Sequence, residues 1–156
     1  MKITSVAVLG AGAVGSYVIW GLSNREDIKL GVIAEGERKE RLKHQGCAIN
    51  GNIYHPEVWA PEEAENMDFL IVSLKYGALP GALEDIGKIV GKDTIVMSLM
   101  NGVDSEDIIA EQIGKKVEVK MMLQQDAGIT QTRLVNVSVE EKIRQQVHFD
   151  NIEIED

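Results

Sequence analysis

Three glycines near the start of the chain have the spacing of a phosphate-binding turn. Residues 6–22 read VAVLGAGAVGSYVIWGL, and they contain a G-x-G-x-x-G pattern between an apolar run and a helix-like segment. In this pattern the glycines permit a tight turn, a close approach to pyrophosphate and tight helix packing, and the helix N–H groups bind the phosphates. Glycines that serve only strand–helix packing are the alternative interpretation. The predicted dinucleotide site comprises Gly10, Ala11, Gly12, Ala13, Val14 and Gly15.

A carboxylate stands where a dinucleotide site would contact the adenosine ribose. Glu35 follows a predicted strand at residues 28–34 and lies 20 residues beyond Gly15. An acidic residue at this place accepts hydrogen bonds from the ribose hydroxyls and repels a 2′-phosphate, the group that distinguishes NADP from NAD. Arg38 and Lys39 follow closely and could offset part of that repulsion. A solvated turn residue is the alternative interpretation of Glu35.

The elements that would position these residues alternate along the chain. Short apolar runs rich in β-branched residues are typical of buried parallel strands, and helix-like segments separate them. The predicted strands are residues 3–9, 28–34, 69–74, 94–99 and 117–123. The predicted helices are residues 14–22, 37–45, 79–90 and 105–113, the last with Asp104 or Ser105 as N-cap and Gly114 as its end. This alternation predicts an α/β fold, a Rossmann-like, doubly wound, mostly parallel sheet with helices on both faces.

Three segments depart from this alternation. Asn50-Gly51, between two short β-like runs, is typical of a type I′ hairpin. Pro56 and Pro61 are predicted to bracket a loop. Residues 129–139 alternate in a β-like pattern and predict an antiparallel β-hairpin near the C-terminal edge of the sheet. We expect a single nucleotide-binding domain over residues 1–139, and a C-terminal tail or edge strand over residues 140–156.

Composition argues against several classes of partner. The formal net charge of −9 repels nucleic acid and anionic membranes, so we expect neither as a partner. Cys47 is the single cysteine, which excludes a disulfide within the chain and favours a reducing compartment. We see no signal peptide or membrane-length apolar run, and therefore expect a cytoplasmic protein. His44, His55 and His148 are far apart in the sequence, so we expect no metal site.

Two further motifs follow the glycine pattern. They are V-S-L-K, which ends at Lys75, and L-M-N-G-V, which contains Asn101. With all three motifs in order, the chain resembles the N-terminal nucleotide-binding domain of the ketopantoate reductases (2-dehydropantoate 2-reductases). The resemblance implies an oxidoreductase that reduces the ketone of 2-dehydropantoate with NADPH, in pantothenate biosynthesis. It also implies that Lys75 lies beside the cofactor, and that Asn101 lies beside the nicotinamide and the substrate.

Both residues also follow predicted strands, at the sheet edge where doubly wound folds bind ligands. A lysine supplies a point charge for phosphate or carboxylate, and an asparagine amide both donates and accepts hydrogen bonds. The alternatives are a solvent-facing lysine for Lys75 and a turn at Asn101 that tolerates left-handed backbone.

The chain departs from the family pattern in two ways. Glu35 stands where relatives that use NADPH carry an arginine, so the expected cofactor is NADP or NAD, and Glu35 favours NAD. The family's helical domain, with its general-acid lysine and most substrate-binding residues, is not expected within these 156 residues. We therefore expect no catalytic residue in this chain, which would act on a 2-oxo acid only together with a C-terminal domain. The alternatives are a non-catalytic nucleotide-binding or regulatory module, or a module that forms a homodimer through the uncovered surface.

Overall fold

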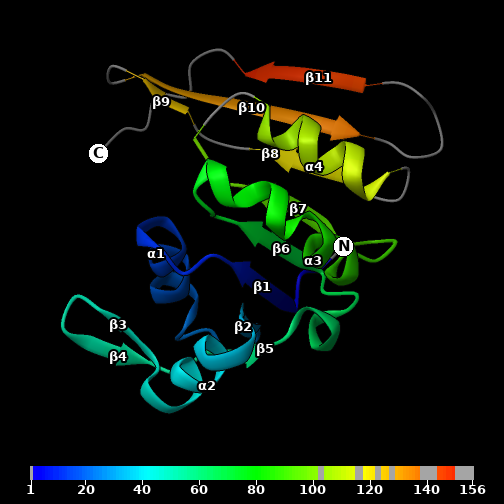
Figure 1. The fold of residues 1–156 in the computed structure, drawn as a ribbon. Helices are drawn as coiled ribbons and strands as arrows, with labels where there is room; N and C mark the ends of the chain where they lie inside the picture. The colour runs from blue at the N-terminus through cyan, green and yellow to red at the C-terminus, as the bar shows by residue number, and fades with distance from the viewer. Residues whose placement is uncertain are drawn as a thin grey trace.

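A six-stranded parallel sheet forms the centre of the computed structural model (Figure 1). The structure describes residues 2–101 and 104–114 with their side chains, and residues 118–121, 124–126, 129–137 and 144–149 as backbone strands. The strands of the sheet, in spatial order, are β5 (Glu57–Trp59), β2 (Lys29–Ile33), β1 (Ser5–Leu9), β6 (Phe69–Val72), β7 (Ile95–Ser98) and β8 (Glu118–Met121). The order reverses between β1 and β6, and ligands bind at such a switch point in doubly wound sheets. The predicted doubly wound fold is confirmed.

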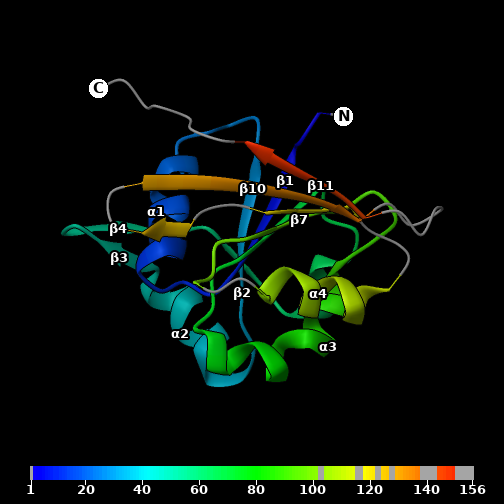
Figure 2. The same ribbon diagram turned by 90° about the horizontal axis from the view of Figure 1, so that it is seen from above.

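Helices cover both faces of this sheet. They are α1 (Ala13–Leu22), α2 (Gly36–Gln45), α3 (Leu79–Ile89) and α4 (Ser105–Ile113). Successive side chains of a strand point to opposite faces, so Val6 and Val8 join a core with α1, while Ala7 and Leu9 join a second core with α3 and α4. Figure 2 shows α3 and α4 side by side, apart from α1. Both faces of β1 are therefore buried, as its continuous apolar sequence requires.

Local signals account for the limits of two helices. Pro80 lies in the first turn of α3, where its missing N–H group costs little. Gly114 ends α4 with a φ of 63°, and its N–H group donates to the carbonyl of Ala110 at 3.1 Å. Asp104, one of the two predicted candidates, is the N-cap residue of α4, but its carboxylate accepts a hydrogen bond from Tyr76 instead of capping the helix.

A short hairpin follows α2. Strands β3 (Cys47–Ile49) and β4 (Asn52–Tyr54) pair antiparallel. Asn50 and Gly51 have φ values of 50° and 81°, and positive φ at both central residues is the mark of a type I′ turn. The predicted hairpin turn is therefore confirmed. Cys47 and Ile49 point into the α1 side of the core and anchor the hairpin to the sheet.

The predicted loop between Pro56 and Pro61 is wrong. This segment contains β5, which pairs parallel with β2 and forms one edge of the main sheet. Pro61 then begins η1 (Pro61–Ala64), a short 3₁₀ helix. A strand of three residues is too short to show a periodic pattern, and prolines occur at the ends of edge strands as well as in loops. Burial of Val58 and Trp59 holds β5 in place.

The last described strands form a separate antiparallel sheet. β10 (Ile129–Val137) lies between β9 (Gln124–Asp126) and β11 (Arg144–Phe149). Antiparallel pairing is present in this region as predicted, but residues 129–137 form a single strand and not both strands of a hairpin, and they belong to a sheet apart from the main one. The partner strand β11 lies inside the segment for which we expected a tail or an edge strand. Residues 138–143 and 150–156 of the predicted hairpin and tail lie outside the described residues. Among the helices that the structure describes, none is long and apolar enough to cross a membrane.

Candidate functional site

The glycine turn lies at the switch point between β1 and β6. Gly10 has a φ of 103°, a backbone conformation that favours glycine. Its carbonyl oxygen accepts a hydrogen bond of 2.5 Å from Ser73 Oγ, and the Ser73 N–H group donates to the Leu9 carbonyl at 2.9 Å. A Cβ atom on Gly10 would lie 2.7 Å from the Ser73 carbonyl oxygen. The first residue after β6 therefore fixes the course of the turn after β1.

The other two glycines of the pattern have opposite surroundings. A Cβ atom on Gly15 would lie 1.9 Å from the Gly10 carbonyl oxygen, so only glycine lets α1 approach the turn this closely. A Cβ atom on Gly12 would meet nothing within 4 Å. Gly12 is the N-cap residue of α1, and the first N–H groups of a helix have no partner within it. Open space beside such N–H groups fits a phosphate of a dinucleotide.

The three other residues of the pattern differ in exposure. Ala11 packs partly against the core on the α1 side of the sheet. Ala13 and Val14 are exposed in the first turn of α1, and 49% of Val14 is accessible. The backbone of this turn is therefore reachable from solvent on the side of Gly12.

Glu35 lies at the carboxyl end of β2, one strand from the glycine turn. It is exposed and is the N-cap residue of α2. The preceding residue, Ala34, donates its N–H group to the Trp59 carbonyl at 2.9 Å, so the end of β2 is held to the end of β5. Arg38 and Lys39 follow Glu35 on α2, and Lys39 forms an ion pair with Glu63. The carboxylate thus stands at the same sheet edge as Gly12.

Lys75 and Asn101 are exposed just beyond the ends of β6 and β7. Lys75 is the N-cap residue of η2 (Tyr76–Ala78), a single 3₁₀ turn before α3. Because β6 and β7 are parallel neighbours, both residues lie at the edge that holds the glycine turn. Gly102 and Val103, which complete the asparagine motif, lie outside the described residues. The structure thus places all the predicted site residues at one edge of the sheet.

The side chains that connect these loops were not predicted from the sequence. Tyr76 Oη donates a hydrogen bond of 2.7 Å to Asp104 Oδ2, which joins the loop of Lys75 to the loop of Asn101. Ser73 was also missed, although it precedes Lys75 within the V-S-L-K motif. A tyrosine directly after a site lysine was the available signal for Tyr76. The contact of Asp104 with Tyr76 could not be foreseen, because an aspartate directly before a helix is already explained as an N-cap residue.

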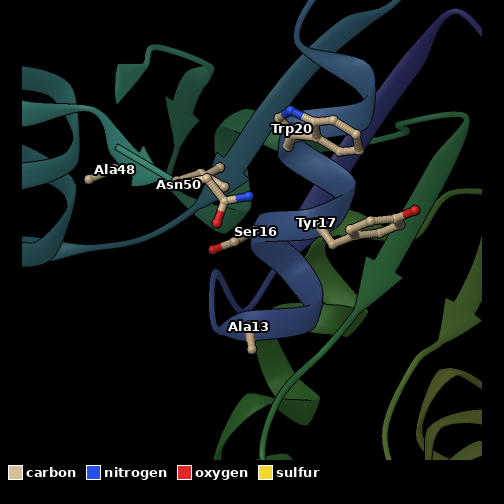
Figure 3. Close-up of a pocket in the computed structure, with 7 residues that line it drawn as sticks. Ala13, Ser16, Tyr17, Trp20, Ala48 and Asn50 are labelled. Carbon is tan, nitrogen blue, oxygen red and sulfur yellow. The ribbon is translucent and has the colours of Figure 1, made fainter. Parts of the chain in front are cut away.

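A pocket of about 460 Å³ lies between α1 and the β3–β4 hairpin (Figure 3). Its lining residues are Ala13, Ser16, Tyr17, Trp20, Ala48, Ile49 and Asn50. The rings of Tyr17 and Trp20 have centroids 5.6 Å apart on the exposed face of α1. Trp59 is buried in the core, whereas Trp20 is 46% exposed. The pocket includes Ala13 of the glycine pattern but none of the other predicted site residues.

Cys47 has the character of a core residue. It is buried at the start of β3, and this burial raises the pKa of its thiol. A thiol that stays protonated is a poor nucleophile. Within the described part of the chain, no group of three or more His, Cys, Asp or Glu side chains could hold a metal ion.

Comparison with known proteins gives a consistent result. Residues 6–148 match the family model described as ketopantoate reductase PanE/ApbA. The 2-dehydropantoate 2-reductase of Mesorhizobium japonicum is 32% identical over 108 residues, which are 66% of this chain and 32% of that protein. The solved 2-dehydropantoate 2-reductase from Geobacter metallireducens is 27% identical with a TM-score of 0.58, over 81% of this chain and 45% of that one. D-mandelate dehydrogenase, solved with NADH and anilino(oxo)acetate, is 25% identical with a TM-score of 0.59, over 81% of this chain and 45% of that one.

The family match includes all of β1 but its first residue, and it includes the glycine turn, Glu35, Lys75 and Asn101. The chain spans about a third of the length of the curated relatives that it matches, 32% of one and 36% of another. The match covers well over half of this chain, and the parallel sheet with its glycine turn at the switch point agrees with the structural relatives. The chain therefore belongs to the ketopantoate reductase family.

Proposed function

We propose that this chain is the nucleotide-binding part of an oxidoreductase similar to ketopantoate reductase, and that it binds a nicotinamide dinucleotide at the carboxyl edge of its sheet. The observation that carries the proposal is the open space at Gly12, at the first turn of α1 and at the switch point. When bound there, the nicotinamide would supply a hydride to the ketone of a 2-oxo acid.

The residues at this edge have complementary roles in the proposal. Backbone N–H groups from Gly12 to Gly15 bind the pyrophosphate at the start of α1. Lys75 places a positive charge beside a phosphate or a substrate carboxylate. Asn101 donates and accepts hydrogen bonds at the nicotinamide end, where it also contacts the substrate.

Reduction of a ketone also needs a proton donor and a cleft that excludes water. We propose that a second domain supplies both, as the family resemblance implies. The chain by itself would then bind the cofactor without turning it over. This part of the proposal is tested by adding 2-dehydropantoate and NADH to the purified chain, and steady oxidation of NADH at enzymatic rates would contradict it.

We propose NAD as the preferred cofactor. Glu35 is exposed at the carboxyl end of β2, where a carboxylate accepts the ribose hydroxyls and repels a 2′-phosphate. The NADH in the solved D-mandelate dehydrogenase shows that a structural relative takes the cofactor without this phosphate.

Calorimetric titration of NADH and NADPH tests this choice. We expect tighter binding of NADH, and a weaker or inverted preference in Glu35→Arg. Glu37→Arg is the matched control, because Glu37 is exposed in the first turn of α2 and the change in charge is the same. Equal affinities of the wild-type chain for the two nucleotides would contradict the role of Glu35. If neither nucleotide binds, the proposed function itself is wrong.

A further inference from the structure

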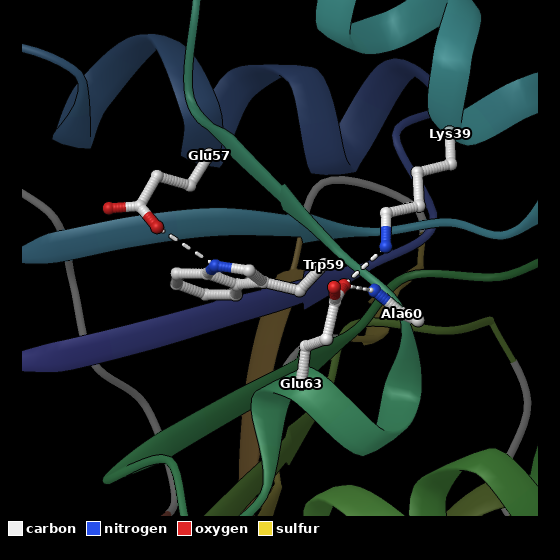
Figure 4. A network of polar contacts seen from close by, with 5 residues as sticks. All are labelled: Lys39, Glu57, Trp59, Ala60 and Glu63. Atoms are coloured by element: carbon white, nitrogen blue, oxygen red, sulfur yellow. Dashed lines mark hydrogen bonds and ion pairs between the residues drawn. The ribbon is translucent and has the colours of Figure 1, made fainter.

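An ion pair lies at the end of β5 (Figure 4). The neighbouring strand is β2, which ends two residues before Glu35. Lys39 Nζ on α2 donates a hydrogen bond to Glu63 Oε2 on η1. The same oxygen accepts the N–H group of Ala60 at 2.6 Å. One carboxylate therefore fixes both the lysine and the backbone that leaves β5.

This ion pair belongs to the same corner of the sheet edge as Glu35. The N–H group of Lys39 donates to the Glu35 carbonyl at 3.2 Å, because Glu35 is the N-cap of the helix that carries Lys39. On the other side, the Ala34–Trp59 backbone hydrogen bond joins the end of β2 to the end of β5. A nucleotide whose ribose contacts Glu35 would therefore have Lys39 and Glu63 close by.

Lys39 is a cation of the kind that binds a 2′-phosphate, and it lies at this corner. A phosphate is bound by charge-assisted hydrogen bonds from lysine or arginine. The Lys39 side chain is only 15% exposed, and its ammonium group faces Glu63, whose pKa it lowers by a hydrogen bond. Arg38 is also on α2 but is exposed, and its charge opposes the rise that burial causes in the pKa of the Cys47 thiol.

We infer that Glu63 is a positioning residue for cofactor choice: it holds Lys39 away from the place of a 2′-phosphate and so reinforces the repulsion by Glu35. This inference rests on the proposed nucleotide site. Cofactor preference then depends on two carboxylates. Glu35 would face the ribose, and Glu63 neutralises the charge of Lys39.

The variant Glu63→Gln tests this role. The amide keeps an oxygen that can accept the Ala60 N–H group, but it removes the charge that binds Lys39. Glu62→Gln is the matched control, since Glu62 is the neighbouring residue on η1 and pairs instead with Lys88 at 2.9 Å. The probes are adenosine 2′,5′-bisphosphate and adenosine 5′-monophosphate, which differ only in the 2′-phosphate.

We expect Glu63→Gln to raise the affinity for the bisphosphate relative to the monophosphate by about threefold at low ionic strength, the size of effect of a partly exposed charge pair. Affinity for the monophosphate should stay unchanged, because a general disturbance of the site would weaken the binding of both probes. Adding Lys39→Gln to this variant should abolish the gain. Lys39→Gln alone should lower the ratio, because Glu63 then keeps an uncompensated negative charge at this corner, and this variant tests the inference even if Glu63→Gln does not fold.

An equal ratio in Glu63→Gln and Glu62→Gln would overturn the inference, as would a gain that persists without Lys39. An unchanged ratio in Lys39→Gln alone would also overturn it. So would a ratio below that of the wild type in the double variant, because the lysine would then already serve the phosphate. In these cases the wild-type chain still binds NADH, so the proposed function stands. If the chain binds neither NADH nor either probe, the proposed function fails and the inference fails with it.

Discussion

Tyr76 and Asp104 connect the two loops that follow β6 and β7. The phenol oxygen of Tyr76 donates a hydrogen bond of 2.7 Å to Asp104 Oδ2, and this contact raises the pKa of Tyr76. Lys75 immediately precedes the tyrosine, and Asn101 lies shortly before the aspartate. One side-chain pair therefore sets the spacing between the loops proposed to hold the nicotinamide end of the cofactor.

Removing the hydroxyl group of Tyr76 should weaken cofactor binding more than it weakens the fold. In Tyr76→Phe the loops lose their connection, so we expect the affinity for NADH to fall about threefold to tenfold, the usual net value of one hydrogen bond. Calorimetric titration measures this change. Thermal unfolding should change little, because Tyr76 is 48% exposed.

Tyr17→Phe is the control for this prediction, since Tyr17 is 71% exposed on α1 and the chemical change is the same. If both variants bind NADH as tightly as the wild-type chain, Tyr76 has no positioning role.

Alanine at two glycines of the phosphate-binding pattern should separate folding from binding. Gly15→Ala places a Cβ atom 1.9 Å from a backbone oxygen, so the free energy of unfolding should fall by about 1–3 kcal/mol or more. Gly12→Ala places its Cβ atom in open space, so stability should stay within about 0.5 kcal/mol of the wild type.

The added methyl group of Gly12→Ala should nevertheless reduce NADH affinity, because it occupies the space proposed for the pyrophosphate. Chemical denaturation and nucleotide titration on both variants provide the two measurements. Unchanged NADH affinity in Gly12→Ala would place the phosphates elsewhere.

Elements marked by an apolar run or by an amphipathic helical pattern were predictable from the sequence. Residues 105–113 form α4 with the predicted bounds, and the strands around β1, β2, β6 and β7 lie within their predicted ranges. Each of these buries an apolar face along most of its length, so its sequence carries the signal. The predicted site residues share one edge for the same reason, since each directly follows a parallel strand or begins a helix.

What could not be predicted depends on contacts between distant segments. β5 has only three residues, and its place at the sheet edge depends on Trp59 packing against Gly31 in β2. The pairing of Lys39 with Glu63 joins residues 24 positions apart. Such contacts leave no pattern in a single sequence. Lys39 and Glu63, each taken by itself, are typical of a solvated surface.

The fit between Gly31 and Trp59 makes the position of β5 testable. A Cβ atom on Gly31 would lie 2.2 Å from the indole ring, so Gly31→Ala should destabilise the fold by about 1–3 kcal/mol. A smaller side chain in Trp59→Leu leaves room for that Cβ atom. The double variant should therefore be less destabilised than the sum of the two single variants. Additive losses in chemical denaturation would mean that the two residues do not pack together.

Asp68 should make the stability of the sheet depend on acid pH. Its Oδ2 atom accepts hydrogen bonds from the Thr4 N–H group at 2.8 Å, the Thr4 hydroxyl at 2.9 Å and the Ser5 N–H group at 3.0 Å, which join the starts of β1 and β6. These bonds, chiefly those from Thr4, lower the pKa of Asp68 below its ordinary value of 3.8. The ionised carboxylate is thus favoured by folding, so its contribution is complete above pH 3.8 and is lost as the pH falls through the lower folded-state pKa.

Asp68→Asn should therefore reduce the free energy of unfolding by about 1 kcal/mol at pH 7. The difference from the wild type should shrink as the pH falls below 3.8, because the wild-type carboxyl group then becomes protonated. Urea denaturation at a series of pH values measures this convergence. Asp93→Asn, at an exposed position before β7, is the control for the same change of side chain. A loss that stays constant down to the lowest pH would show that the charge of Asp68 contributes nothing, and that only its shape holds the two strands together.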